Sequence, residues 1–156
     1  MNVTIDYLEN YPHHIPALAQ WMFEKWGFFY PRSSLETTTK WVTKTARKSG
    51  LPLTMIALDG PNLVGFVMLQ KHELCPVKGL TPWLGGLLVK EDYKCKGIGK
   101  KLHQSAIDYV KHLPCKKLYL LTFDPALCDW YGDLGWTVLK TDKVDHHPIT
   151  IMSVDL

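Results

Sequence analysis

The sequence has few cysteines, and they follow none of the spacings that bind zinc or staple a small secreted domain. The four cysteines are spread along 156 residues, no two form a C-x-x-C pair, and no clustered histidines join them. We therefore expect reduced thiols and no metal site. The four are Cys75, Cys95, Cys115 and Cys128.

Long hydrophobic runs are also missing. No apolar stretch approaches the ~18–20 residues of a membrane span, and the first residues carry no basic segment followed by an apolar core. We expect no membrane partner and a cytoplasmic location. Hydrophobic residues still make up 46% of the chain, which is enough for one globular domain over residues 1–156.

Charge of one sign is scarce as well. The formal net charge is only +3, and lysines are spread over both halves of the chain. A nucleic-acid-binding surface needs a denser basic patch. The composition therefore argues against a nucleic-acid partner.

The most informative stretch of the sequence lies between Leu84 and Pro114. It begins with an apolar run, turns at a charged Lys-Glu-Asp, and continues through a basic segment that contains Gly97 and Gly99. Apolar residues at helical spacing then follow as far as the proline. The pattern predicts a strand, a basic glycine loop and a helix N-terminus. The apolar positions of this helix are Ile98, Leu102, Ala106, Tyr109 and Leu113.

A helix N-terminus after a basic, glycine-spaced loop is typical of phosphate binding. Its first N–H groups have no partner within the helix, and the helix dipole attracts anions. Glycine lets the backbone approach a ligand closely, and lysines add long-range attraction. The segment lacks the Gly-Lys-Ser/Thr ending of a P-loop, and Leu102 stands where the dinucleotide fingerprint requires its third glycine.

Hydrophobic periodicity predicts the remaining elements. Ser33 and Glu36 form a capping-box pattern, and Asp124 is expected to cap the last helix. The paired Gly85 and Gly86 indicate a bulge or a close backbone approach inside a strand. Strands are expected at residues 3–7, 53–58, 63–71, 82–89, 117–123, 136–140 and 149–154, helices at 12–26, 33–48, 98–113 and 124–134, and a polar, histidine-bearing loop at 141–148.

Two segments resemble the GCN5-related N-acetyltransferases, the GNAT superfamily. Residues 94–99, Lys-Cys-Lys-Gly-Ile-Gly, are similar to its acyl-coenzyme A signature Q/R-x-x-G-x-G/A, with lysine in the first place. Residues 124–136, Asp-x₆-Tyr-x-x-Leu-Gly-Trp, resemble its Tyr-x-x-x-Gly-Phe/Trp ending. The predicted order of elements matches this family from end to end. The resemblance implies an α/β fold of the GNAT type, with a mixed, partly splayed sheet flanked by helices.

The resemblance also implies that acetyl-CoA is bound. Amides of the loop 95–100 would hold the pyrophosphate, and a splayed strand would pair with the pantetheine arm. The loop lysines can also be read as ordinary solvated charge, and Lys94 replaces the family's planar Arg or Gln. The implied cofactor-binding residues are Leu87, Leu88, Val89, Lys94, Cys95, Lys96, Gly97, Ile98, Gly99, Lys100 and Asp124.

Three residues carry the expected chemistry of acetyl transfer. Tyr131 would protonate the departing thiolate, although its place on an apolar helix stripe also suits a core residue. Glu73, at the end of a sheet strand, would accept the proton of the amine, and an exposed loop glutamate is the equal alternative. A backbone N–H of the strand Leu87–Val89, first of all that of Leu88, is expected to stabilise the oxyanion.

The expected function is acetyl-CoA-dependent N-acetylation of a primary amine by direct attack within a ternary complex. No covalent enzyme intermediate is needed, so Cys95 is expected to be dispensable. The alternatives are a catalytically silent acyl-CoA sensor or interaction module and an acyltransferase for a longer acyl group. Aminoglycosides, polyamines and peptide N-termini all stay open as acceptors, and a homodimer is a further expectation.

An aromatic patch near the end of the first helix has two interpretations. It can form a wall of the acceptor pocket, as the resemblance implies, or it can be more core. Its members are Trp21, Phe28, Phe29 and Tyr30.

Overall fold

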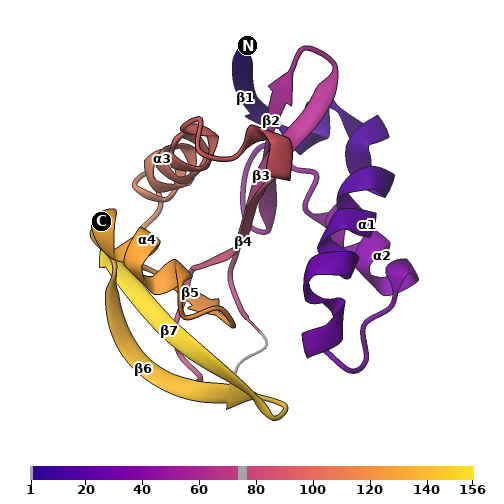
Figure 1. Cartoon of the computed structure of the whole chain (residues 1–156). Coiled ribbons are helices and arrows are strands. Elements are labelled where there is room, and N and C mark those ends of the chain that lie inside the picture. The colour runs from indigo at the N-terminus through magenta and orange to yellow at the C-terminus, as the bar shows by residue number, and fades with distance from the viewer. Residues whose placement is uncertain (1, 74–76) are drawn as a thin grey trace.

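The computed structural model describes residues 2–73 and 77–156 and contains one mixed seven-stranded sheet, in the order β1-β2-β3-β4-β5-β7-β6 (Figure 1). The strands are β1 (Val3–Tyr7), β2 (Leu53–Asp59), β3 (Asn62–Gln70), β4 (Trp83–Val89), β5 (Lys117–Thr122), β6 (Thr137–Val144) and β7 (His147–Asp155). The α-helices are α1 (Ile15–Trp26), α2 (Leu35–Lys44), α3 (Ile98–Val110) and α4 (Leu127–Asp133). Short 3₁₀ helices are η1 (Leu8–Asn10), η2 (Pro12–His14), η3 (Gly27–Phe29) and η4 (Glu91–Tyr93).

Helices cover both faces of the first half of the sheet. In Figure 1, α1 and α2 lie on one side of β1–β4 and α3 lies on the other. Successive side chains of a strand point to opposite faces, and β2 follows this rule. Met55 and Ala57 pack in the cluster that contains α3, whereas Ile56 and Leu58 pack in the cluster that contains α1. The near-continuous apolar runs of β2 and β3 are explained by burial on both faces.

The sheet parts between β4 and β5. These two strands are parallel, and they pair at one position only, Trp83 with Tyr119. On its other side β5 pairs with β7 along its whole length, from Lys117–Asp155 to Thr122–Thr150. The splayed, mixed sheet that the resemblance implies is therefore present.

The paired glycines form a bulge next to this parting. Met68 of β3 is opposite Gly86 of β4, but the next residue, Leu69, is opposite Leu84, so Gly85 is the extra residue. A Cβ on Gly85 would lie 2.5 Å from Cδ of Gln70. The bulge and the close approach that the sequence offered as alternatives occur together, and the close neighbour is a side chain of the protein itself.

The N-cap of helix α2 lies one residue later than predicted, and the helix ends earlier. This N-cap is Ser34, whose Oγ accepts a hydrogen bond from the N–H of Thr37 at 3.1 Å. The capping box therefore pairs Ser34 with Thr37 and not Ser33 with Glu36. The helix stops at Thr45, a buried residue whose hydroxyl accepts a hydrogen bond from Thr54 at 2.7 Å. This buried bond turns the chain towards β2.

Two further predictions were wrong. Asp124 does not cap α4, which starts at Leu127 with Ala126 as its N-cap. The carboxylate of Asp124 instead accepts the N–H of Ala126 at 3.0 Å and closes a turn. Residues 141–148 are not a loop, because β6 and β7 continue to a tight hairpin turn at Asp145, whose φ is +56°.

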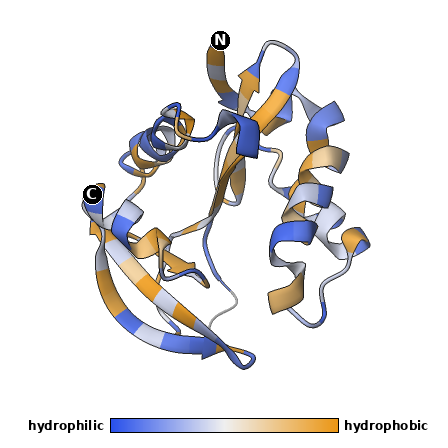
Figure 2. Cartoon of the chain, viewed as in Figure 1, coloured by the Kyte–Doolittle hydropathy of each residue, from blue (hydrophilic) through white to orange (hydrophobic). Residues whose placement is uncertain are grey.

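The exposed edge strand β6 is largely hydrophilic (Figure 2). No helix in residues 2–73 and 77–156 combines the length and the apolar character that crossing a bilayer requires.

A buried histidine ties α3 to the second half of the sheet. His103 of α3 is 5% exposed, and its Nε2 accepts a hydrogen bond from Nε1–H of Trp136 at 2.9 Å. Burial lowers the pKa of His103, so the folded protein favours the neutral ring. The unfolded chain, in contrast, protonates this side chain near pH 6.5.

We expect His103 to make folding stability depend on pH. Because the folded-state pKa is the lower one, stability is fully present above about pH 6.5 and falls as the pH drops towards the folded pKa, by at most ~1.4 kcal/mol per pH unit. Urea unfolding between pH 5 and 8 should show that the free energy of unfolding depends less steeply on pH in His103→Gln than in the parent. The exposed His112→Gln, just after the same helix, is the matched control, and an equal slope in all three proteins contradicts the assignment.

Candidate active site

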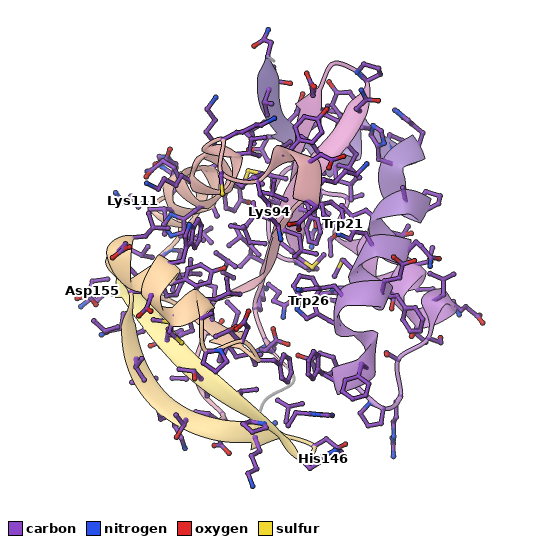
Figure 3. The ribbon with its side chains drawn as sticks, viewed as in Figure 1. Trp21, Trp26, Lys94, Lys111, His146 and Asp155 are labelled. Atoms are coloured by element: carbon purple, nitrogen blue, oxygen red, sulfur yellow. The ribbon has the colours of Figure 1, made fainter. Side chains whose placement is uncertain are left out.

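A cavity of about 840 Å³ opens between the first two helices and the parted strands. Trp26 projects from α1 towards β4 (Figure 3), and a Cβ on Gly86 would lie 3.1 Å from its ring. The cavity is lined by residues of α1, α2, β4, β5 and α4 and by the residues that follow β3. Its lining includes Met22, Trp26, Tyr30, Arg32, Trp41, Lys44, Met68, Gln70, Lys71, Glu73, Gly85, Gly86, Leu87, Thr122, Phe123 and Tyr131.

Tyr131 is both a core residue and a wall of this cavity. It is 6% exposed, and its ring makes edge contacts with Trp130 and Trp136 at centroid distances of 5.0 and 5.7 Å. Burial raises the pKa of the Tyr131 phenol well above its usual range, so the phenol stays protonated at any physiological pH. The two interpretations of Tyr131 from the sequence therefore do not exclude each other.

Glu73 lines the same cavity and is held by a buried glutamine. Nε2 of Gln70, a residue that is 7% exposed, donates a hydrogen bond to Oε2 of Glu73 at 2.9 Å. Glu73 itself is half-buried and not a fully solvated loop residue. The structure thus brings Glu73 and Tyr131, which lie far apart in the sequence, to one cavity. Sequence analysis missed Gln70, because a polar residue that ends an apolar run is typical of any strand end.

The N–H of Leu88 faces β3 and not the opening. The N–H of Lys90 donates to the carbonyl of Val64 at 2.8 Å, and Leu88 lies opposite Phe66 in the same antiparallel register. N–H groups of alternate residues point to the same side of a strand, so Leu88 uses its N–H for β3. The N–H of Leu88 is therefore not free to act as the oxyanion donor, contrary to the expectation from the sequence.

The same alternation turns the main-chain groups of Leu87 and Val89 towards the opening. Beyond Trp83, β4 has no partner on that side in the described part of the chain. Leu87 also lines the cavity, whereas Leu88 and Val89 do not. One strand edge therefore runs from the cavity towards the start of α3 with polar main-chain groups facing outward.

The loop before α3 presents a run of unpaired N–H groups. Gly97, the N-cap of α3, has a φ of +83°, a left-handed conformation that favours glycine. Within residues 2–73 and 77–156, the N–H groups from Cys95 to Lys100 donate no main-chain hydrogen bond. The first N–H that does bond belongs to Lys101, which donates to the carbonyl of Gly97 at 3.1 Å. Unpaired N–H groups at a helix start are the geometry that favours anion binding in proteins.

Side chains of the loop take part in local interactions. Lys94 forms an ion pair with Glu91 at 2.8 Å, and the hydrogen bond from Lys94 lowers the pKa of Glu91. Nζ of Lys96 lies 5.5 Å from the centre of the Tyr93 ring. Both lysines are exposed, as is Cys95, whose φ of +62° is also left-handed.

The structure also describes four more of the predicted cofactor-binding residues. Gly99 is close to a side chain of the protein, because a Cβ there would lie 3.3 Å from the Trp130 ring. Ile98, the first residue of α3, is buried, and Lys100 on the first turn of this helix is exposed. Asp124 is exposed at the end of β5 and does not line the cavity.

The aromatic patch divides between core and cavity. Trp21 packs edge-on against the buried Phe66 at 5.3 Å, and Tyr30 lines the cavity. Phe29 stacks on Phe123 of the cavity wall at 3.9 Å, whereas Phe28 is 77% exposed. Part of the patch is therefore core, and part of it lines or contacts the wall of the cavity.

The hairpin turn between β6 and β7 brings together potential metal ligands. Ligand atoms of Asp145, His146 and His147 lie within 4.8 Å of one another, and His146 lies at the tip of the hairpin (Figure 3). Asp145 already contacts His146 at 3.1 Å, and the three residues are consecutive. Their proximity follows from the turn itself.

Solved structures share this fold over nearly the whole chain. The PaiA N-acetyltransferase of Thermoplasma acidophilum, solved in complex with coenzyme A, has a TM-score of 0.69 and 22% identity and covers 100% of both chains. A putative GNAT-family acetyltransferase of Desulfovibrio desulfuricans has a TM-score of 0.72 and 15% identity, with 99% of each chain covered. Arabidopsis thaliana NAA60, in complex with a bisubstrate analogue, has a TM-score of 0.71 and 18% identity, again with 99% of each chain covered.

Sequence comparison identifies the family. No curated protein matches the chain at a significant level. The family model described as Acetyltransferase (GNAT) family matches residues 15–136, from the start of α1 to the end of the Tyr-x-x-Leu-Gly-Trp segment. With this match over most of its length, the chain belongs to the acetyltransferase (GNAT) family, as an N-acetyltransferase that uses acetyl-CoA.

Proposed function

We propose that the chain transfers the acetyl group directly to a primary amine held in the cavity beside Tyr131 and Glu73. The observation that carries the proposal is the open edge of β4, which joins the unpaired N–H groups before α3 to that cavity. When bound, acetyl-CoA supplies the activated thioester. The chain then has to hold an anion and an amine, accept a proton, stabilise a developing oxyanion and protonate a thiolate.

The loop before α3 is the proposed diphosphate site. Unpaired N–H groups from Cys95 to Lys100 fit a phosphate anion, and Gly97 keeps the approach to them free, since a Cβ there would meet no atom within 4 Å. Main-chain groups of Leu87 and Val89 are positioned to pair with an extended, amide-containing arm, as a neighbouring strand would. The PaiA relative was solved with coenzyme A.

Glu73 is the proposed proton acceptor. An amine with a lysine-like pKa of ~10.4 is almost fully protonated near neutrality, so it must lose a proton before it attacks. The hydrogen bond from Gln70 fixes one carboxylate oxygen of Glu73 and so orients the carboxylate at the cavity wall. Gln70 is in this scheme a positioning residue.

Leu87 and Tyr131 are the proposed groups for the carbonyl and the thiolate. The N–H of Leu87 faces the opening at the cavity wall, so it replaces that of Leu88 as the donor to the developing oxyanion; one such donor is worth ~2.7–4 kcal/mol. The protonated phenol of Tyr131 is the proposed acid for the thiolate. Because burial raises the pKa of this phenol, complete proton transfer to a thiolate is uphill, and a hydrogen bond from the phenol to the sulfur is what stabilises the departing thiolate as the C–S bond breaks.

A homodimer, a cytoplasmic location and a single domain over residues 1–156 stay predictions.

Tyr131→Phe should lower kcat strongly while acetyl-CoA binding is retained. The substitution keeps the ring that packs on Trp130 and Trp136 but removes the proposed proton donor. We expect a loss of about 10²-fold or more in kcat. Thiol release measures kcat, calorimetry measures coenzyme A affinity, and thermal unfolding checks the fold. An unchanged kcat would remove Tyr131 from the mechanism.

Glu73→Gln should lower turnover most at neutral pH. The amide cannot accept the proton, so we expect a loss of about 10²-fold or more at pH 7. The loss should shrink as the pH approaches the pKa of the free amine, because the solvent then removes the proton. A pH profile of kcat/KM measures this, with the exposed Glu36→Gln as control. A loss that is the same at every pH argues against a base.

Gly97→Ala should weaken acetyl-CoA binding. A left-handed alanine costs about 1–3 kcal/mol, so the loop would relax away from its anion-binding form and KM for acetyl-CoA would rise roughly tenfold. Gly79→Ala is a matched control, because Gly79 has a φ of +84° and a Cβ there would also meet no atom within 4 Å. Equal KM values in the two variants contradict the diphosphate site.

A further inference from the structure

The wall of the acceptor cavity is mostly aromatic and apolar. Trp26, Trp41 and Phe123 line it together with Met22 and Met68. Its volume of about 840 Å³ lies within the range of pockets that bury a small organic ligand. Such a wall contributes to binding by burying an apolar or aromatic body, since flat rings offer contact area and few polar groups.

Charged side chains also line this cavity, and they come from both ends of α2 and from the segment after β3. Arg32 precedes α2 and Lys44 ends it, while Lys71 directly follows β3. Glu73 is the carboxylate among the cavity residues of the described part of the chain. The charged side chains of the cavity therefore carry an excess of positive charge around one negative group.

Within residues 2–73 and 77–156, no ion pair neutralises Arg32, Lys44 or Lys71. All three are exposed at the mouth, where charges of one sign around a concave apolar surface attract oppositely charged ligands. Lys40, on the same helix as Lys44, is by contrast paired with Glu36 at 3.3 Å and does not line the cavity.

This charge pattern disfavours two of the three acceptor classes. A polyamine or an aminoglycoside carries several ammonium groups, and only one of them can lie beside Glu73. The others would lie among the unpaired cations, where like charges repel. One ammonium group and at least one anionic group are the complementary pattern.

We infer that the acceptor is a primary amine on an apolar or aromatic body that also carries an anionic group. This inference rests on the proposed function of the same cavity. The ammonium group lies towards Glu73, the body against the tryptophans, and the anion towards Arg32, Lys44 and Lys71. A small amino carboxylate and a peptide N-terminus followed by acidic residues share this chemistry.

Matched ligands test the inference. Phenethylamine, para-(aminoethyl)benzamide and para-(aminoethyl)benzoate differ in one ring substituent, which is absent, neutral or anionic. In the presence of coenzyme A, calorimetry should show the benzoate binding about tenfold more tightly than the benzamide, as expected for charge-assisted contacts, and the difference should shrink as salt is added. Spermidine should bind more weakly than all three.

Peptides distinguish the source of the anion. Phe-Asp-Asp, Phe-Asn-Asn and Phe-Lys-Lys are compared in the same way, with amidated C-termini. Tighter binding of the acidic peptide than of the benzoate identifies a peptide N-terminus, and the reverse identifies a small amino carboxylate. If neither anionic ligand binds more tightly than its neutral partner, the inference is overturned.

Variants locate the effect in this cavity. Lys44→Met and Arg32→Gln should each reduce the preference for the benzoate over the benzamide about threefold to tenfold, whereas Lys40→Met should leave this preference unchanged. Thiol release with acetyl-CoA is measured in parallel. Selective anion binding without thiol release from any ligand contradicts the proposed enzyme activity but supports the inference. Thiol release that is equal for the benzoate and the benzamide contradicts the inference but supports the activity.

Discussion

The separation of β4 from β5 after one residue pair is the constraint on which the rest of the molecule depends. The pivot is Trp83, which is 1% exposed, pairs with Tyr119 and donates its indole N–H to the carbonyl of Leu80 at 2.7 Å. It packs with Ile149 and Ile151 of β7. Because the pivot is buried and hydrogen-bonded, the strands are held together at one end and free to diverge at the other. The opening between β4 and β5 therefore results from the way the buried side chains pack.

The two halves of the sheet are joined by the core beneath α3. Leu84 of β4, Leu102 of α3 and Leu118 of β5 belong to one buried cluster that also contains Trp136. The hydrogen bond between His103 and Trp136 adds a directional contact to this apolar layer. A layer of this kind resists closure of the gap, because moving β5 onto β4 would displace α3. The edge of β4 therefore keeps unpaired main-chain groups that an isolated sheet would cover.

The bulge at Gly85 couples this edge to the carboxylate. Gln70 occupies the space that a side chain at position 85 would take, and its amide reaches Glu73 from there. The same extra residue sets which groups of β4 point outward, since a slip of one residue exchanges the two sides of a strand. One glycine thereby fixes both the position of the proposed base and the orientation of the Leu87 N–H.

The order of elements follows from the sequence pattern and the splayed sheet from the family resemblance, whereas several local details follow from neither. Alternation and helical spacing report burial, and burial determines the layers, so β2, β3 and α3 lie close to their predicted bounds. Asp124 was assigned to a helix cap because an N-cap and an Asx turn use the same side chain. Leu88 was assigned to the opening because the register that orients it depends on the bulge.

The residues of the candidate site likewise divide into those that the sequence predicts and those that it does not. The motif around Tyr131 and the glycine loop are short and local, so the sequence predicts them. Arg32, Lys44 and Lys71 are separated along the chain and look like ordinary surface charge until the fold places them on one cavity. Only the tertiary structure shows this convergence.

Positively charged or polarised groups lie at both ends of the proposed active site, at the start of α3 and around α2, but they are of different kinds. On the α3 side the donors are main-chain N–H groups that cannot move away, and Lys94, which precedes them in the sequence, is paired with Glu91. Fixed dipoles cost little to organise, which suits a cosubstrate that must be bound in every turnover.

On the α2 side the cations are long, exposed side chains that can follow ligands of different length. Glu73 lines the same cavity as these cations, and it alone among the charged cavity residues of the described chain attracts an ammonium group. An amine with an anionic tail would therefore bind with its nitrogen towards Glu73 and its tail towards the exposed cations, which leaves the nitrogen beside the group proposed to accept its proton.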